Sequence, residues 1–220
     1  MDKFFRFSDY DVFAYLTAGF AAFAIADLAT GTAIVWNGQW TVASGALTIL
    51  GAYVAGQIIA TPASWMERGL VFGLLGAPAD ILFHGSRRGL SKAFEYYRPL
   101  DARIAAPIRA AMQAGDSGKV LFGLAHANAR KNPAAAVRVD SFLRLYGLCR
   151  NLSFVLFIGA CVLMIASFDA ETPRADTLRA YAAISVVAGA GMFFRYLKFL
   201  RLFAVEVFTA YSISLSERAA

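Results

Sequence analysis

Long apolar stretches alternate with polar breaks along this chain, and their lengths predict membrane-spanning helices. Residues 12–36 contain no Lys, Arg or Glu and a single Asp. Residues 41–60 contain no charged side chain, and residues 152–168 form a third uncharged stretch. An α-helix rises about 1.5 Å per residue, so about 20 apolar residues cross a hydrocarbon core of about 30 Å. With a fourth stretch from near Thr177 to Arg195, the pattern predicts four spans.

The polar breaks predict two short turns and one long central region. Residues 37–40 separate the first two spans, and residues 169–176 separate the last two. Asn132 and Pro133 offer an N-cap followed by a proline at the first helical position, so the third span is expected to be the upper part of a long helix. We therefore expect an all-α, polytopic membrane protein with two transmembrane hairpins and a helical cytoplasmic region between the second and third spans.

This layout predicts four segments and several shorter helices. The segments are a first hairpin over 1–62, a basic helical region over 63–150, a second hairpin over 151–204 and a cytoplasmic tail over 205–220. Within the basic region, helices are expected over 101–114 and 119–131, with a turn between them. The apolar residues 69–83 are too interrupted by glycine and proline to span, which leaves an interfacial, a re-entrant and a core-helix interpretation open.

Composition and charge support a membrane location and give an orientation. The chain is 59% hydrophobic and only 16% charged, against about 25% charged in an ordinary soluble domain. Residues 64–150 carry 13 Lys or Arg and 6 Asp or Glu, whereas residues 169–176 carry three acids and one Arg. Because basic loops stay in the cytoplasm, we expect a multi-pass protein of the bacterial inner membrane with both termini cytoplasmic.

Asp27 is the most informative polar residue, because a carboxylate within a span costs about 2.5–3.5 kcal/mol on insertion scales. It is expected at the depth of Gly51, where Thr48 and Tyr53 can donate hydrogen bonds. The candidate functions are an ion pathway or a proton site, and the alternative is a hydrogen-bonded carboxyl that fixes helix packing. Gln57 is a further candidate, as an interhelical hydrogen-bonding group.

Small residues recur every four positions on both helices of the first hairpin. They are Ala14, Ala18, Ala22, Ala26 and Thr30 on the first span, and Ser44, Thr48, Ala52, Gly56 and Ala60 on the second. Such faces let helices approach closely in lipid. The pattern predicts a tight interface, either within one subunit or between subunits.

Two basic groups are candidate sites for anionic headgroups or a phosphorylated ligand. They are Arg87, Arg88 and Lys92, beside aromatic residues of the central region, and Arg195, Lys198 and Arg201, along the end of the fourth helix. The alternative is ordinary topology-determining charge, with the second group anchoring the membrane edge and forming an intrahelical or intersubunit pair with Glu206.

Signatures of catalysis and metal binding are missing from the sequence. There is no H-E-x-x-H, no P-loop, no G-x-S-x-G and no dinucleotide-binding glycine motif. His84 and His126 are isolated, and Cys149 and Cys161 suit apolar packing better than redox chemistry or metal ligation. We expect no enzymatic activity, no cofactor and no metal.

The layout resembles small bacterial membrane effectors of anti-phage defence. The resemblance is carried by residues 9–11 before the first span, 142–151 before the third and 195–198 after the fourth, together with the two hairpins and the basic middle. Within that class the chain is most similar to the channel-forming Hailong type. The resemblance implies a homo-oligomeric channel gated at its cytoplasmic face by a nucleotide or oligonucleotide, with no functional residue carried over.

Two hypotheses follow from the residues and the resemblance. The first is a homo-oligomeric ion channel, with Asp27 or the small-residue faces near the pathway and the basic region as the regulatory surface. The alternative is a non-conducting membrane scaffold that recruits partners or anionic lipid through the same basic region. A secondary transporter ranks third, because the two halves lack matching Gly/Pro-interrupted spans.

Overall fold

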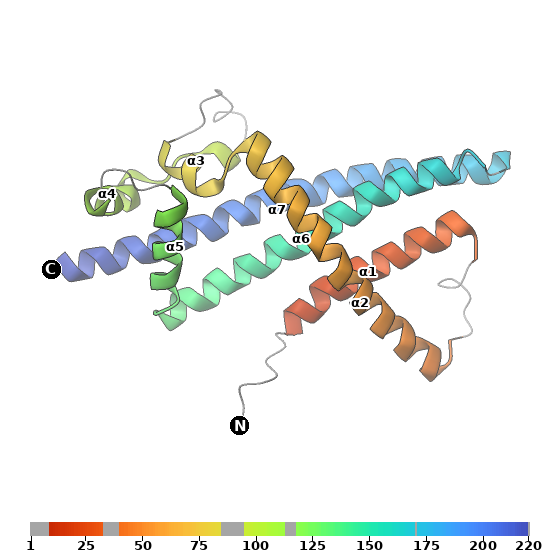
Figure 1. Cartoon of the computed structure of the whole chain (residues 1–220), viewed down its shortest axis with the longest axis horizontal. Coiled ribbons are helices and arrows are strands. Elements are labelled where there is room, and N and C mark those ends of the chain that lie inside the picture. Colours follow the sequence, from red (N-terminus) through yellow and green to blue (C-terminus); the bar gives the residue numbers. More distant parts are fainter. Residues whose placement is uncertain (1–8, 33–39, 85–94, 113–117, 170, 220) are drawn as a thin grey trace. The chain divides into compact units, whose positions relative to one another are not determined.

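A computed structural model describes residues 9–32, 40–84, 95–112, 118–169 and 171–219 of the 220-residue chain (Figure 1). These residues are almost all helical, with no strand among them. The elements are α1 (Asp9–Thr30), α2 (Val42–Met66), the π-helical segment η1 (Glu67–Leu75), α3 (Pro78–His84), the 3-10 turn η3 (Glu95–Tyr97), α4 (Ala102–Ala111), α5 (Gly118–Ala129), α6 (Pro133–Ala166) and α7 (Thr172–Ala219). The all-α class is therefore confirmed for this part of the chain.

The chain divides into two compact units whose boundaries differ from the four segments expected from sequence. Unit 1 combines 1–67 with 147–196, and unit 2 combines 68–146 with 197–220. The long helices α6 and α7 each contribute one portion to both units. The residues of the expected tail over 205–220 continue α7 as far as Ala219.

Unit 1 contains two helical hairpins. Helices α1 and α2 cross each other, and the portions of α6 and α7 that belong to unit 1 run side by side (Figure 1). The Ser153 hydroxyl donates to the Gly189 carbonyl at 3.0 Å, which joins α6 to α7 directly. Ile25 of α1 packs on the small cluster formed by Leu163 and Leu178, so the first hairpin contacts the second.

The crossing of α1 and α2 confirms that small residues form a close interface within one chain. Ala18 and Ala52 are fully buried at the crossing. A side chain added to Gly56 would collide with the Tyr15 backbone carbonyl, and one added to Gly19 would collide with that of Ala52. Away from the crossing, the small residues at the ends of the two expected faces are not buried. Ala26 and Thr30 on α1 and Ser44 on α2 are exposed.

Helix α1 is shorter than the predicted first span. It ends at Thr30 rather than near Trp36, because Gly31 adopts a left-handed φ of 72° and its N–H bonds to the Asp27 carbonyl at 2.8 Å. Most of the expected turn over 37–40 lies outside the described residues. Helix α2 then begins with a capping box in which the Thr41 and Ser44 side chains each accept from the other residue's backbone N–H.

The predicted start of the long third helix is confirmed. The Asn132 side-chain oxygen accepts from the backbone N–H of Ala134 and of Ala135, at 3.0 and 3.3 Å, and Pro133 is the first residue of α6. The helices expected over 101–114 and 119–131 are also present, as α4 and α5.

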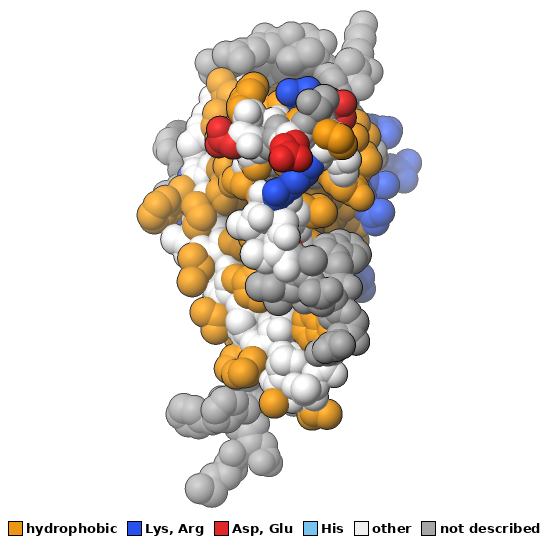
Figure 2. Space-filling view, turned by 90° about the vertical axis from the view of Figure 1, so that its right-hand side faces the viewer, with side chains coloured by type: hydrophobic (Ala, Val, Ile, Leu, Met, Phe, Trp, Pro, Cys, Tyr) orange, Lys and Arg blue, Asp and Glu red, His pale blue; other side chains and the backbone are white. Residues whose placement is uncertain are grey.

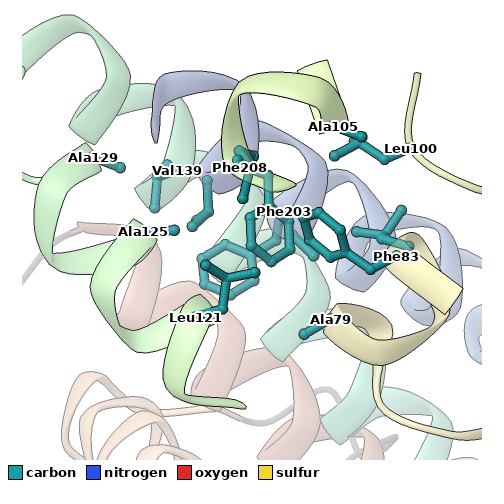
Figure 3. Packing of buried hydrophobic residues seen from close by; sticks show 14 residues of the cluster. Ala79, Phe83, Leu100, Ala105, Leu121, Ala125, Ala129, Val139, Phe203 and Phe208 are labelled. Atoms are coloured by element: carbon teal, nitrogen blue, oxygen red, sulfur yellow. The ribbon is translucent and has the colours of Figure 1, made fainter. Parts of the chain in front are cut away.

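Unit 2 has an apolar core built from five helices. Its three largest aromatic members are Phe83 of α3 and Phe203 and Phe208 of α7, which lie together in Figure 3. The rings of Phe83 and Phe208 meet edge to face at 4.8 Å between centroids. Helix α3 enters this core through Ala79, Leu82 and Phe83, which favours the core-helix interpretation for the end of 69–83, whereas η1 continues directly from α2.

Among the described residues, three helical stretches are long and apolar enough to cross a membrane. They are Val42–Phe83, Pro133–Ala166 and Pro173–Arg218, while the apolar part of α1, Ala14–Thr30, is shorter. Many large hydrophobic side chains lie at the surface (Figure 2). Those on α2 include Leu47, Leu50, Ile58 and Trp65. Those on the unit 1 portions of α6 and α7 include Ile165, Ile184 and Val187. Exposed apolar area of this extent requires lipid or another protein surface as its surroundings.

Candidate intramembrane polar site

Asp27 occupies a protected position near the end of α1. It is one turn before the Gly31 terminus, and only 5% of the residue is exposed. The Thr32 hydroxyl folds back and donates to Asp27 Oδ1 at 2.6 Å. The carboxylate therefore has a short hydrogen bond from a residue just past its own helix, which holds it in place.

A cavity of about 270 Å³ lies beside Asp27. It is formed by α1, the start of α2 and the residues that flank them. The lining residues are Phe23, Ala26, Asp27, Thr30, Thr32, Trp40 and Thr48. Asp27 and Thr48, both singled out from the sequence, thus line one cavity, although Thr48 donates its hydroxyl proton to the Ser44 carbonyl at 2.9 Å. The hydroxyl that contacts Asp27 belongs instead to Thr32, which sequence reasoning missed.

Gln57 and Tyr53 lie further along α2 and interact with each other. The Gln57 amide donates to the Tyr53 hydroxyl at 3.0 Å within the same helix, and Gln57 is exposed. The Tyr53 ring meets the Tyr15 ring of α1 edge to face, with centroids 6.2 Å apart. The expected contact between α1 and α2 at this level is therefore aromatic, and among the described residues Gln57 does not join two helices.

The candidate basic residues fall into different surroundings. Arg87, Arg88 and Lys92 lie outside the described residues. Arg195 and Lys198 are exposed on α7, whereas Arg201 is half-buried and donates to the Arg98 carbonyl at 3.0 Å. This bond fastens the segment after η3 to α7, so Arg201 has a packing role within unit 2.

Glu206 has a partner on another helix of the same chain. Its carboxylate accepts from Arg138 Nε of α6 at 2.6 Å. Arg138 stands far from Glu206 in the sequence, so the spacing of charges along α7 contained no signal for the pair. The bond joins α6 to α7 within unit 2.

A second buried polar cluster lies in unit 1 and was not predicted. Glu67 is the C-cap of α2 and the first residue of η1, and it is 6% exposed. Its carboxylate accepts from Arg150 Nη1 at 2.8 Å and from the Tyr196 hydroxyl at 3.0 Å. Arg150 also donates through Nε and Nη2 to the Asn151 side-chain oxygen, at 3.2 and 3.1 Å. The three residues Glu67, Arg150 and Tyr196 come from three different helices, and each lies within four residues of a point where the chain passes from unit 1 to unit 2.

One sequence signal for this cluster existed. Glu67 is the first charged residue after the uncharged second span, and Arg150 is the last before the uncharged third span. Two opposite charges at matching ends of antiparallel apolar helices are placed to pair, because both lie at the same depth. The tyrosine carried no such signal, since its depth on α7 depended on where that helix began.

His126 is a titratable side chain at the edge of the unit 2 core. Its ring stacks on Phe122 and meets Phe203 edge to face. Burial lowers the pKa of His126 from its ordinary value, the Arg130 guanidinium lowers it further, and Asp140 opposes the shift.

Within the described part of the chain, no three His, Cys, Asp or Glu side chains gather in a way that suits a metal ion.

Comparison with known proteins gives no match: no protein-family model, no curated protein and no solved structure is similar to this chain. The function is therefore argued from the chemistry of the two polar clusters and from the apolar helices that surround them.

Proposed function

We propose that this chain is a four-span inner-membrane protein that assembles into a homo-oligomeric, cation-conducting channel, with Asp27 in the ion path. The observation that carries the proposal is the buried Asp27 carboxylate beside a cavity of about 270 Å³, on a helix whose surroundings are apolar. An intramembrane carboxylate rarely faces lipid and marks ion or proton pathways when a cavity adjoins it.

The apolar surface supports insertion in a membrane and assembly with further copies. Helices α2, α6 and α7 present large side chains that nothing in their own unit covers, with Leu47, Ile58 and Val187 each at least two-thirds exposed. Lipid covers such surfaces, and a second copy does the same. Four helices in one chain leave little room for a pore between them, so the channel of this proposal forms between copies.

The lengths of α6 and α7 support a cytoplasmic region attached to the membrane part. These helices have 34 and 48 residues, and a straight helix of about 20 residues already crosses the hydrocarbon core. In the proposed orientation, the basic unit 2 lies in the cytoplasm. The regulatory ligand is an anion, with the basic residues Arg195 and Lys198 as its exposed contact candidates.

The test is ion flux through the purified chain in proteoliposomes and planar bilayers. Wild-type protein is expected to dissipate a K⁺ gradient and to give unitary currents. Asp27→Asn, which keeps the size of the side chain and removes its charge, is expected to lower K⁺ conductance or K⁺/Cl⁻ selectivity about tenfold, because a fixed charge in a pore sets its cation preference. Asp140→Asn makes the same chemical change at a partly exposed carboxylate of unit 2, which pairs with Arg130, and is expected to conduct as wild type.

Unchanged conductance and selectivity in Asp27→Asn would remove Asp27 from the ion path. The absence of unitary current at every voltage, with protein shown to be inserted, would favour the alternative of a non-conducting scaffold. That alternative has its own support in the exposed cations Arg195 and Lys198, and it predicts binding of the chain to anionic partners without any current.

The role in anti-phage defence stays a prediction based on resemblance of layout. It is tested by infecting bacteria that carry the gene or its Asp27→Asn variant. Protection accompanied by loss of membrane potential in the wild type, and by neither in the variant, would support it; equal phage yields with and without the gene would contradict it.

A further inference from the structure

We propose that α2 pairs with α2 of a second copy of the chain, with the two Gln57 side chains hydrogen-bonded to each other. This inference rests on the proposed function, because it names a surface through which the copies assemble. It is argued from the spacing of exposed residues on α2, the hydrogen bonding of Gln57 and the depth of Gln57 in the apolar helix.

Five exposed residues of α2 form a seam along the helix. They follow one another at alternating steps of three and four positions, and they are Leu47, Leu50, Val54, Gln57 and Thr61. The three apolar members are 68%, 59% and 48% exposed. This spacing is that of the a and d positions of a left-handed helix pair, in which the side chains of each helix fill the gaps on the other.

The seam lies on the side of α2 that faces away from α1. Ala52 and Gly56 form the close contact with α1. At about 100° per residue, these two positions lie about 160° around the helix axis from the centre of the seam. Thr48, which lines the Asp27 cavity, also lies off the seam. Pairing through the seam therefore disturbs neither the α1 contact nor the proposed ion path.

Gln57 is the member of the seam with hydrogen-bonding capacity to spare. Its amide has two N–H groups and a carbonyl oxygen. One N–H donates to the Tyr53 hydroxyl at 3.0 Å, and among the described residues Gln57 makes no other hydrogen bond. One donor and one acceptor are left on an exposed side chain. Lipid tails cannot bond to either, so an amide facing them is unfavourable.

The depth of Gln57 leaves another protein as the source of those bonds. Ten residues separate it from Glu67, the first charged residue after the uncharged stretch. At about 1.5 Å per residue this is about 15 Å, half of a hydrocarbon core of about 30 Å. Water and lipid headgroups are absent at that depth. Amide side chains within the membrane instead bond to polar groups of neighbouring helices.

A second copy of this chain supplies the matching groups. Copies inserted in the same direction bring Gln57 to the same depth, and a two-fold axis between them sets the two side chains opposite each other. The spare N–H of each amide then donates to the carbonyl oxygen of the other. A single polar residue in a seam also fixes the register, because a shifted alignment leaves both amides among apolar side chains.

The first test is disulfide crosslinking of the full chain in membranes, in a variant with Cys149→Ala and Cys161→Ser. Leu50→Cys lies in the seam, and Ile49→Cys is the matched control at almost the same depth. The two positions are similarly exposed, at 59% and 53%, but lie about 100° apart around the helix. A disulfide needs Cα atoms about 4.4–6.8 Å apart. With a chemical oxidant, Leu50→Cys is expected to form a covalent dimer and Ile49→Cys to stay mainly monomeric.

The second test measures the dissociation constant of the dimer in detergent by analytical ultracentrifugation. Gln57→Leu keeps an apolar surface and removes the amide, and it is expected to weaken association several-fold to about tenfold, as for one interhelical hydrogen-bonded pair. Tyr53→Phe removes the bond within α2 and leaves the amide intact, so it is expected to associate at least as tightly as wild type.

Equal crosslinking at positions 49 and 50, or undiminished association of Gln57→Leu, would overturn the inference. K⁺ flux through the same preparations separates it from the proposed function. If flux depends on Asp27 but positions 49 and 50 crosslink alike, the α2 seam fails and the channel stands with another surface as its interface. If the seam pairs as expected but no current flows, the interface stands and the channel fails.

Discussion

At the scale of single residues, two glycines decide how the first hairpin packs. Gly19 faces the Ala52 carbonyl and Gly56 faces the Tyr15 carbonyl, and neither site has space for one more carbon atom. The backbones themselves are in contact there, which gives α1 and α2 strong van der Waals attraction without large side chains. The exposed members Ala26, Thr30 and Ser44, at the ends of the small-residue faces, tolerate change because they lie away from this crossing.

Gly56→Ala is expected to destabilise the protein by about 1–3 kcal/mol, because the new methyl group meets a backbone carbonyl that cannot move independently of α1. The measurement is the thermal midpoint of the purified protein in detergent. Gly191→Ala is the matched control, since nothing lies within 4 Å of a methyl group at that position of α7, and helix propensity then raises the midpoint slightly. Equal midpoints for the two variants would show that the backbones are not in contact at Gly56.

A second prediction concerns the pH dependence of unit 2. The pKa of His126 is lowered in the folded chain, by burial first and then by Arg130, so the unfolded chain binds more protons just below pH 6.5. Stability is therefore expected to fall as the pH decreases from about 6.5 toward the lowered pKa. The measurement compares thermal midpoints at pH 7.5 and 5.5, and His126→Gln is expected to show the smaller decrease. A larger decrease in the variant would contradict the direction of the shift.

At the scale of helices, the buried cluster around Glu67 joins three elements. The carboxylate at the end of α2 binds Arg150 of α6 and Tyr196 of α7, and the side chains of Glu67 and Arg150 are 8% and 15% exposed. A buried charge without its partner costs far more than an exposed one, so each member depends on the others. The π-helical segment η1 begins at Glu67, and such segments are frequent at functional positions.

Arg150→Met is expected to destabilise the folded protein by about 3–5 kcal/mol, because Glu67 is left buried without its cation. Tyr196→Phe removes a single hydrogen bond and is expected to cost about 1 kcal/mol, which makes it the milder control. In the double variant Glu67→Leu with Arg150→Met, part of the stability is expected to return, as measured by denaturant or thermal unfolding in detergent. Additive losses would show that the two side chains do not interact.

The elements were largely predictable from sequence, whereas their ends and pairings were only partly so. Asn132 followed by Pro133 is a local capping signal, and it marked the start of α6 correctly. The end of α1 was misplaced because a single Gly31 within an apolar stretch does not reveal that it adopts a positive φ. The pair of Arg138 with Glu206 depends on the alignment of α6 with α7, which no local pattern contains.

The candidate site was predictable to the same extent. Asp27 stood out because charge is rare in apolar helices, and Thr48 followed from its expected depth. Thr32 was missed because the first span was expected to continue as helix past position 30, whereas the chain turns at Gly31 and brings the hydroxyl back to the carboxylate. Only the correct end of α1 would have identified it.

At the scale of the whole molecule, the orientation in the membrane is a prediction that chemical labelling tests directly. In a variant with Cys149→Ala and Cys161→Ser, Asp176→Cys is expected to react with a membrane-impermeant maleimide on intact spheroplasts. Glu217→Cys is expected to react only after lysis, because the positive-inside rule places the C-terminus in the cytoplasm. Labelling of position 217 from outside, or of position 176 only after lysis, would reverse or refute the proposed topology.

The division of the chain also has a consequence for its coding sequence. The core of unit 2 takes Phe203, Val207 and Phe208 from α7, the last helix described. A premature stop codon after position 200 would therefore leave α3, α4 and α5 without their largest apolar neighbours. Such a nonsense allele is expected to behave as a null rather than as a mild truncation, with the shortened product recognised by membrane quality-control proteases.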